Sequence, residues 1–425
     1  MLRHLSYSAI LDGGGVLAIL LVQILTIRIF GIEIYGEYAF INSILIVIAA
    51  LSNFGIPNFS SRLIAQEDKL LHDEVKKKSF LLTVFFSTIA IVIFLAYSYS
   101  LTLMSSGMYI AVALYFLSRN IITLISLQLQ YERRILISKL LSPVGQPFIL
   151  VLILLFIISF DLHLNSSIIL WQLLAISSVL VSIVSILIYR QSLFASESTI
   201  QIKKLIKWGI SNGKFYLLAN SSNILQKRIA VILCGFLLAD SITGKVNILL
   251  QISTLSLTLL SSINHVLIPR ISSNYKSRND LEFLRDIKVS LVFGFCSSFL
   301  FLLFSVLIGR NVIDIFFTDS DSMAYYSLLV LAFGQVINAS TGPIGFVLTM
   351  TNHEKLVAKV DFQNIFILAL ILPLLLLEMG LLGACLATAI SIVIRNTRLT
   401  VIAKKQYGFH TSLGILLRDP LTNML

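Results

Sequence analysis

The stretch SFLLTVFFSTIAIVIFLAYSYS, from Ser79 to Ser100, contains no Asp, Glu, Lys or Arg, and the three lysines Lys76 to Lys78 come directly before it. An apolar run of this length matches the roughly 20 residues that a helix needs to cross the hydrocarbon core of a bilayer. Flanking lysines are typical of the cytoplasmic end of such a helix. The stretch therefore predicts a membrane-spanning helix.

The rest of the chain repeats this pattern. It is 425 residues long, 57% hydrophobic and only 12% charged, whereas an average soluble protein has about 25% charged residues. The apolar runs predict twelve spans near residues 8–30, 38–57, 79–100, 107–130, 140–160, 167–189, 206–237, 246–268, 289–309, 323–351, 356–377 and 380–402. We therefore predict an all-α membrane protein with twelve transmembrane helices.

The basic residues predict the orientation of these spans. If the N-terminus is cytoplasmic, the inside segments, with the C-terminal segment from Arg395 onward, hold 25 of the 32 Lys and Arg residues, and the outside loops hold only Lys245 and Arg310. Such an excess marks the cytoplasmic side, so both termini are predicted there. The net charge of +11 is scattered over short loops, which predicts no nucleic-acid partner.

An internal repeat relates the two halves of the chain. IYGEY (Ile34 to Tyr38) and ITGKV (Ile242 to Val246) each precede an apolar span that ends in Ile-Pro, at Ile56–Pro57 and Ile268–Pro269. Chance similarity between apolar segments is the alternative. Because each half has six predicted spans, the repeats would be parallel, with two six-helix lobes around a mid-membrane cavity.

This repeat predicts the domain organisation. The predicted parts are an N-terminal lobe at 1–195, a C-terminal lobe at 203–402 and a cytoplasmic tail at 403–425.

The span 206–237 is unusually polar. Its candidate cavity residues are Lys214, Asn220, Ser221, Asn223, Lys227 and Arg228. Lys214, Ser221 and Arg228 recur every seven residues, which keeps them on one helix face. Charges inside a membrane usually face protein or water, so the stripe predicts an aqueous, electropositive cavity. The alternative is that the cations snorkel to the two interfaces.

Arg119 lies near the middle of the span 107–130. Tyr115, Thr123, Ser126 and Gln130 are predicted to share its helix face. A central arginine is far from both interfaces, so it is either a second cation of the cavity or part of an interhelical hydrogen bond.

Three further residues are candidate ion-coupling groups. They are Asp12, Asp361 and His265, each in or near a predicted span. For Asp12 the alternative is a helix N-terminus stabilised by the macrodipole, and for the other two it is a purely structural role.

Motifs for chemistry are missing from the sequence. It contains no Walker loop, no Rossmann glycine fingerprint and no His or Cys cluster with metal-ligand spacing. Cys234, Cys296 and Cys385 lie in apolar runs and are interpreted as packing residues. We predict no cofactor, no metal and no enzyme activity.

Two stretches carry a resemblance to a known family. They are RIFGIEIYGEYAFINSILIVIAALSNFGIPNFSSRLIA, from Arg28 to Ala65, and LLLLEMGLLGACLATAISIVIR, from Leu374 to Arg395. Both resemble segments of the polysaccharide biosynthesis flippases, the Wzx-type translocases of O-antigen and capsule units. These belong to the MOP superfamily, with MATE multidrug exporters and lipid II flippases.

The resemblance implies a bacterial inner-membrane flippase of MATE-like architecture that works by alternating access. Its cargo would be an oligosaccharide joined through pyrophosphate to a polyprenyl lipid, and a polysaccharide polymerase and a chain-length regulator would be candidate partners. The family's cationic cavity implies roles for Lys214, Lys227, Arg228 and Arg119. Relatives often have an acid-Arg pair where this chain has Lys227–Arg228, which leaves ion coupling there in doubt. The alternatives are another exporter of this architecture, or a membrane-embedded glycan polymerase or glycosyltransferase.

Overall fold

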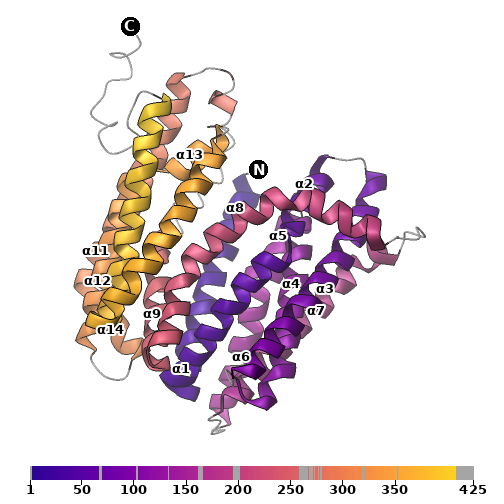
Figure 1. Cartoon of the computed structure of the whole chain (residues 1–425), viewed down its shortest axis with the longest axis horizontal. Helices are drawn as coiled ribbons and strands as arrows, with labels where there is room; N and C mark the ends of the chain where they lie inside the picture. Colours follow the sequence, from indigo (N-terminus) through magenta and orange to yellow (C-terminus); the bar gives the residue numbers. More distant parts are fainter. Residues whose placement is uncertain are drawn as a thin grey trace. The chain divides into compact units, whose positions relative to one another are not determined.

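The computed structural model describes residues 2–66, 69–101, 104–132, 134–160, 166–194, 202–257, 267, 271, 273–275, 277, 280–317, 321–351 and 353–407. All regular elements of this described part are helices (Figure 1). This confirms the predicted all-α class. By its internal contacts the chain divides within one helix into a first unit, Met1–Ile224, and a second unit, Leu225–Leu425. The predicted boundary between residues 195 and 203 lies before this helix, so the lobe boundaries stay a prediction.

The first unit contains the helices from α1 to the first part of α8. They are α1 (Leu2–Ser52), α2 (Ile56–Gln66), α3 (Lys69–Ser100), the 3₁₀ turn η1 (Ser106–Met108), α4 (Tyr109–Tyr131), α5 (Ile135–Lys139), the π-helical η2 (Leu140–Gly145), α6 (Gln146–Ser159), α7 (Ser167–Phe194) and the first part of α8 (Ile202–Leu237). Helix α4 is central, because it packs against α2, α3, α5 and α7.

The second unit begins with the end of α8. It continues with α9 (Asp240–Thr254), η3 (Leu255–Leu257), α11 (Asp280–Phe316), α12 (Ser322–Ser340), α13 (Ile344–Met350) and α14 (Glu354–Tyr407). Helix α12 packs against α9, α11 and α14, so it occupies the centre of this unit.

Eight helices of the described part are long and apolar enough to cross a membrane. They are Gly13–Ser52, His72–Ser100, Ser106–Tyr131, Ile135–Ser159, Ser167–Arg190, Leu281–Phe316, Ser322–Ser340 and Glu354–Gln406. This confirms a multi-pass membrane protein, and the predicted number of twelve spans is not reached by this criterion.

Two of the eight helices are interrupted at a glycine. In α1 the backbone of Gly31 has φ 85° and ψ 164°, and in α14 that of Gly380 has φ 54° and ψ −125°. Both lie in a region that side chains with a Cβ rarely adopt. Each of these helices is therefore two helices joined by a sharp break, near the places where the sequence predicts that one span ends and the next begins.

The predicted span 323–351 is also interrupted. Helix α12 ends at Ser340 and α13 begins at Ile344. Gly342 between them has φ 73°, and Pro343 follows. A positive φ and a residue without a backbone N–H both end a helix. The predicted span 323–351 is therefore not a single helix, and α12 alone is long and apolar enough to be the span.

Helices extend further than the predicted spans. Lys76 to Lys78, which precede the predicted span 79–100, lie in α3, and Glu37, which precedes the predicted span 38–57, lies in α1. Arg395 and Arg398, counted with the cytoplasmic C-terminal segment, lie within α14, as the predicted span 380–402 also places them. The prediction underestimated the lengths of these helices. An apolar run marks only the part of a helix that lies in lipid, whereas the helix itself can continue into water.

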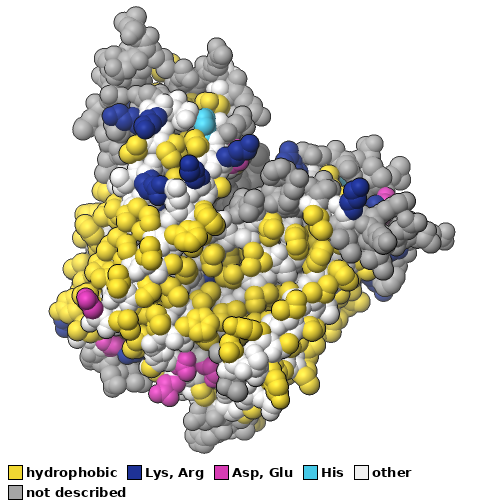
Figure 2. All heavy atoms as spheres, in the orientation of Figure 1, with side chains coloured by type: hydrophobic (Ala, Val, Ile, Leu, Met, Phe, Trp, Pro, Cys, Tyr) yellow, Lys and Arg dark blue, Asp and Glu magenta, His cyan; other side chains and the backbone are white. Residues whose placement is uncertain are grey.

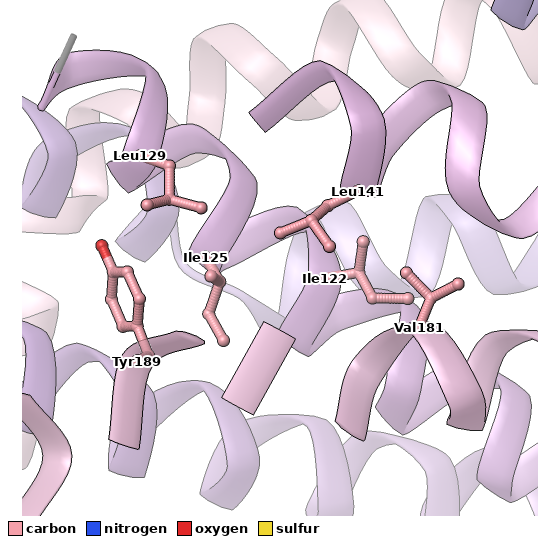
Figure 3. Packing of buried hydrophobic residues seen from close by; sticks show 6 residues of the cluster. All are labelled: Ile122, Ile125, Leu129, Leu141, Val181 and Tyr189. Atoms are coloured by element: carbon pink, nitrogen blue, oxygen red, sulfur yellow. The ribbon is translucent and has the colours of Figure 1, made fainter. Parts of the chain in front are cut away.

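Apolar side chains fill the interior of the first unit. Ile122 and Ile125 of α4 pack against Leu141 of η2 and against Val181 and Tyr189 of α7 (Figure 3). Lipid is as apolar as these side chains, so burying them gains little hydrophobic free energy. Close packing and polar bonds between helices therefore have to hold α4 in place.

The outward surface is strongly apolar. Ile93 of α3 is 64% exposed, Leu307 of α11 is 79% exposed and Leu374 of α14 is 68% exposed. Figure 2 shows hydrophobic side chains covering the visible helices along most of their length, with Lys and Arg side chains gathered at the end of the second unit near α13. A water-exposed protein rarely presents so much apolar surface, which agrees with lipid as the solvent.

Candidate functional site

A pocket of about 300 Å³ lies within the first unit. Its polar lining residues are Asn42 of α1, Asn53 of the turn between α1 and α2, Asn58 of α2, and Tyr115, Arg119, Asn120 and Thr123 of α4. Its apolar lining includes Leu45, Ala50 and Phe116. Among the lining residues of the described part there is one cation and no carboxylate.

Helical spacing places these residues on the pocket wall. Tyr115, Arg119 and Thr123 are four residues apart, so they stack on one face of α4. Ser126 and Gln130, predicted on the same face, continue this spacing along α4 but are not among the residues that line the pocket. Ser126 donates a hydrogen bond of 2.9 Å to the backbone carbonyl of Ser138, and Gln130 is exposed.

Arg119 is held by neutral side chains. Its Nη1 donates to Oδ1 of Asn42 at 3.2 Å and to the hydroxyl of Tyr115. The guanidinium also lies over the ring of Tyr115, with Cζ 5.7 Å from the ring centroid. The Tyr115 hydroxyl in turn donates to Oδ1 of Asn42 at 3.2 Å. These interactions orient the guanidinium without neutralising it.

The electrostatic consequence is a net positive charge in the pocket. An arginine stays protonated in proteins, and a charge inside a membrane usually faces protein or water. Arg119 is partly exposed, and its partners Asn42 and Tyr115 are neutral. An anion that enters the pocket therefore meets a cation without a competing carboxylate.

A closed ring of hydrogen bonds lies beside the arginine. Asn53 Nδ2 donates to Asn120 Oδ1 at 3.1 Å, Asn120 Nδ2 donates to Ser87 Oγ at 3.0 Å, and Ser87 Oγ donates to Asn53 Oδ1 at 3.4 Å. The ring joins the turn between α1 and α2 to α3 and α4, and all three residues are buried. It is a structural element of the pocket, because each of its residues already has partners on both sides.

Helix α8 contributes one predicted residue to this region. Ser221 Oγ donates to the backbone carbonyl of Ala50 at 3.4 Å, and both Ala50 and Ile224 line the pocket. The side chains of Lys214, Asn220 and Asn223 lie outside the described residues.

The other predicted cations of α8 belong to the second unit. Lys227 is exposed and Arg228 is partly buried. Arg119 belongs to the first unit, so a cavity that all three cations share stays a prediction.

Asp361, predicted as a coupling group, is paired. Its Oδ1 accepts a hydrogen bond of 2.7 Å from Nε of Arg395. Nη1 of Arg395 donates to Asn396 Oδ1 at 3.3 Å, and Asn396 Nδ2 donates to Asn338 Oδ1 at 2.6 Å. The pair and its amides join the two parts of α14 to α12, which is the structural alternative considered for Asp361. His265 and the side chain of Asp12 lie outside the described residues.

Sequence reasoning missed Asn42 and Arg395. Asn42 is an isolated amide in an apolar span, a signal that could have marked it. Within the described residues, no three His, Cys, Asp or Glu side chains gather as a candidate metal site.

Comparison with known families identifies a match over more than half of the chain. The family described as "Polysaccharide biosynthesis protein" matches residues 1–275. No curated protein matches the chain.

Solved structures with a similar fold are transporters. An inward-facing multidrug resistance MATE transporter of the MOP superfamily has a TM-score of 0.73 at 14% identity, covering 94% of this chain and 98% of its own. The MATE multidrug transporter DinF-BH has a TM-score of 0.69 at 14% identity, covering 98% and 96%. A MOP superfamily transporter from Pyrococcus furiosus, described as having a binding pocket of reverse polarity, has a TM-score of 0.66 at 14% identity, covering 95% of both chains. The chain therefore has the fold of MATE and MOP transporters.

Proposed function

We propose a function from one premise, which is that this chain belongs to the polysaccharide biosynthesis protein family. It translocates an oligosaccharide linked through pyrophosphate to a polyprenyl lipid, as an O-antigen or capsule repeat unit, from the inner to the outer leaflet of the bacterial inner membrane. It does so by alternating access. The family, the transporter fold and the charge of the pocket support this proposal together.

The observation that carries the proposal is that the described lining of the pocket contains one cation, Arg119, and no carboxylate. Arg119 lines a pocket whose other polar groups are amides and hydroxyls. A pyrophosphate is an anion, and burying it near the middle of a membrane requires compensating positive charge. A pump for hydrophobic cations would need the opposite polarity. The sugar can bind to amides and hydroxyls, and the polyprenyl tail can stay in lipid.

The arrangement of spans that we propose has six helices in each lobe. The two parts of α1, then α3, α4, α5 to α6, and α7 make six. The second six are α8, α9 with η3, α11, α12 and the two parts of α14. Helix α8 has 36 residues, which at about 1.5 Å per residue is long enough to cross the bilayer. We further propose lobes at 1–195 and 203–402 and cytoplasmic termini.

Lys214, Lys227 and Arg228 are proposed to extend the positive surface that Arg119 begins. A polysaccharide polymerase and a chain-length regulator are the proposed partners, because a translocated unit has to be joined into a chain.

The alternative is an exporter of the same fold for another lipid-linked glycan or a drug. The fold similarity to multidrug transporters favours considering it. A drug exporter would confer resistance to cationic dyes when overexpressed, and its loss would leave surface polysaccharide intact.

A null strain separates these functions. We expect it to lose surface polysaccharide and to accumulate complete lipid-linked units on the cytoplasmic leaflet, and wild-type protein should restore export. Lys227→Ala with Arg228→Ala should fail to restore export while the variant protein stays in the membrane. Complete surface polysaccharide in the null strain would overturn the proposal. Truncated units would indicate an enzyme instead.

A further inference from the structure

The guanidinium of Arg119 is anchored through only one of its nitrogens. Nη1 takes part in both hydrogen bonds, to Asn42 and to Tyr115. Nε and Nη2 have no hydrogen-bond partner among the residues that the structure describes. Neither nitrogen is a buried unsatisfied atom, so this edge of the guanidinium is accessible where Arg119 lines the pocket.

The accessible edge has a specific geometry. Nε–H and Nη2–H point in the same direction from a rigid plane, and together they match two oxygens of a single carboxylate or phosphate. A lysine ammonium carries the same charge but lacks this fork. The pocket therefore has a donor pair of fixed spacing as well as a positive charge.

Asn42 fixes the direction of that edge. Its Oδ1 accepts hydrogen bonds from both Arg119 and Tyr115, and its Nδ2 donates to the hydroxyl of Tyr38 at 3.3 Å. The rings of Tyr38 and Tyr115 pack edge-on against Trp171 of α7, with centroids 5.5 Å and 5.6 Å away. Trp171 is fully buried, so it gives the two tyrosines a rigid support.

The start of α2 adds neutral and dipolar donors to the lining. Gly55, Pro57 and Asn58, which lie there, line the pocket. The N-terminal end of a helix carries partial positive charge. The backbone N–H of Asn58 donates to the carbonyl of Gly55 at 3.1 Å. Its side-chain amide has no hydrogen-bond partner in the described part of the chain, so this group remains available to a ligand.

We propose that the Nε–Nη2 edge of Arg119 binds one oxyanion of the cargo in a bidentate manner, and that Asn42 is the positioning residue for this edge. The oxyanion is a phosphate of the lipid pyrophosphate or the carboxylate of an acidic sugar, since the two share the donor geometry. The proposal rests on the proposed function and assigns its anion-binding side chain.

The test measures ligand binding to the purified full-length protein in nanodiscs. The probes are polyprenyl pyrophosphate, inorganic phosphate and glucuronate, each titrated against wild type, Arg119→Lys, Arg119→Ala and Asn42→Leu. We expect about tenfold weaker binding for Arg119→Lys and a larger loss for Arg119→Ala, because charge-assisted bidentate bonds are strong and directional. Asn42→Leu should weaken binding less, since the charge remains.

Arg310→Lys is the matched control. Arg310 also lies over a tyrosine ring, with Cζ 5.2 Å from the centroid of Tyr325, but it belongs to the second unit. The Arg310→Lys variant should bind every probe as wild type does. Gel filtration shows whether each variant is folded. If Arg119→Ala is not folded, the comparison of wild type with Arg119→Lys still decides the test.

The probes identify the source of the oxyanion. Preference for the pyrophosphate lipid would assign the edge to the lipid head group, and preference for glucuronate would assign it to a sugar. Equal binding by wild type and Arg119→Lys would overturn the bidentate edge. If the variants show the expected binding pattern but the null strain exports polysaccharide normally, the edge stands and the proposed function fails.

Discussion

The two units each contain an arginine within a long apolar helix, and the two arginines have opposite surroundings. Among the residues that the structure describes, Arg119 in the first unit has hydrogen bonds only to the neutral side chains of Asn42 and Tyr115. Arg395 in the second unit is paired with Asp361, whose side chain is 9% exposed. The charge of Arg395 is therefore compensated within the protein, whereas that of Arg119 is not. The contrast indicates that the charge of the partner, rather than burial alone, separates a helix-joining arginine from one that is available to a ligand.

The largest effect is expected from breaking the compensated pair. Asp361→Asn leaves the Arg395 guanidinium buried beside a neutral group, which should destabilise the protein by about 3–5 kcal/mol. Thermal unfolding in detergent measures this loss. The double variant Asp361→Leu with Arg395→Met should recover most of the stability, because neither side chain is then charged.

The predicted coupling role of Asp361 gives a different result in the same experiment. Asp361→Asn could instead unfold at the wild-type temperature while transport loses its dependence on pH or sodium. The Asp361–Arg395 pair would then not be needed to join the helices, and the proposed difference between Arg395 and Arg119 would be wrong.

A second prediction concerns Arg119 itself. Arg119→Ala should reduce transport about 10- to 100-fold, because one charge-assisted hydrogen-bonding group contributes about 1.5–3 kcal/mol. Its stability should change by only about 1 kcal/mol, since the lost bonds have neutral partners that can find water in the pocket. Reconstituted vesicles with a fluorescent lipid-linked oligosaccharide measure the transport, and Arg310→Ala is the control. A large loss of stability with normal transport by the remaining folded protein would make Arg119 a structural residue like Arg395.

The smallest effect is expected at an ion pair near the helix ends of the second unit. Lys245 Nζ lies 2.6 Å from Oδ2 of Asp321, whose Oδ1 accepts a hydrogen bond from the backbone N–H of Ala324 at 3.1 Å. Burial alone raises the pKa of Asp321, but the hydrogen bonds from Lys245 and from the first turn of α12 outweigh it, so the pKa is lowered from its ordinary value of 3.8.

The sign of the pH dependence follows from that shift. A carboxyl with a lowered pKa in the folded state stabilises the protein above its unfolded pKa, and this contribution disappears as the pH falls through the lower folded pKa. Asp321→Asn should therefore cost about 1 kcal/mol at pH 7, as partly exposed pairs do, and the difference from wild type should disappear in acid below pH 3.8. Unfolding temperatures between pH 7 and acid measure it. A difference that grows in acid would contradict the assignment.

Much of the fold can be predicted from the sequence because lipid imposes a simple rule. Runs of about 20 apolar residues have to become helices, and the positions of the α1 and α14 breaks follow from Gly31 and Gly380. The end of α12 was missed because Gly342 and Pro343 lie inside a long run without charged residues. The hydropathy pattern predicts one span over that run, although Gly342 and Pro343 prevent the backbone from continuing as one helix.

The candidate site was only partly predictable. Arg119 stands out because a charge in an apolar span is rare, but its helix face does not reveal which neighbouring helix supplies its partner. Asn42 is 77 residues away in the sequence. The pair of Asp361 and Arg395 lies on the two arms that meet at Gly380, so pairing the arms of that predicted hairpin could have found it.

The most direct test of the uncompensated charge is transport by Asn42→Asp. This change gives Arg119 the carboxylate partner that Arg395 already has, and it alters neither the size of the side chain nor the fold. We expect the variant to be as stable as wild type and to flip the lipid-linked oligosaccharide in reconstituted vesicles about tenfold more slowly or not at all, since an ion pair would compete with the cargo for the guanidinium. Transport at the wild-type rate by a folded Asn42→Asp protein would show that an uncompensated charge on Arg119 is not what binds the cargo.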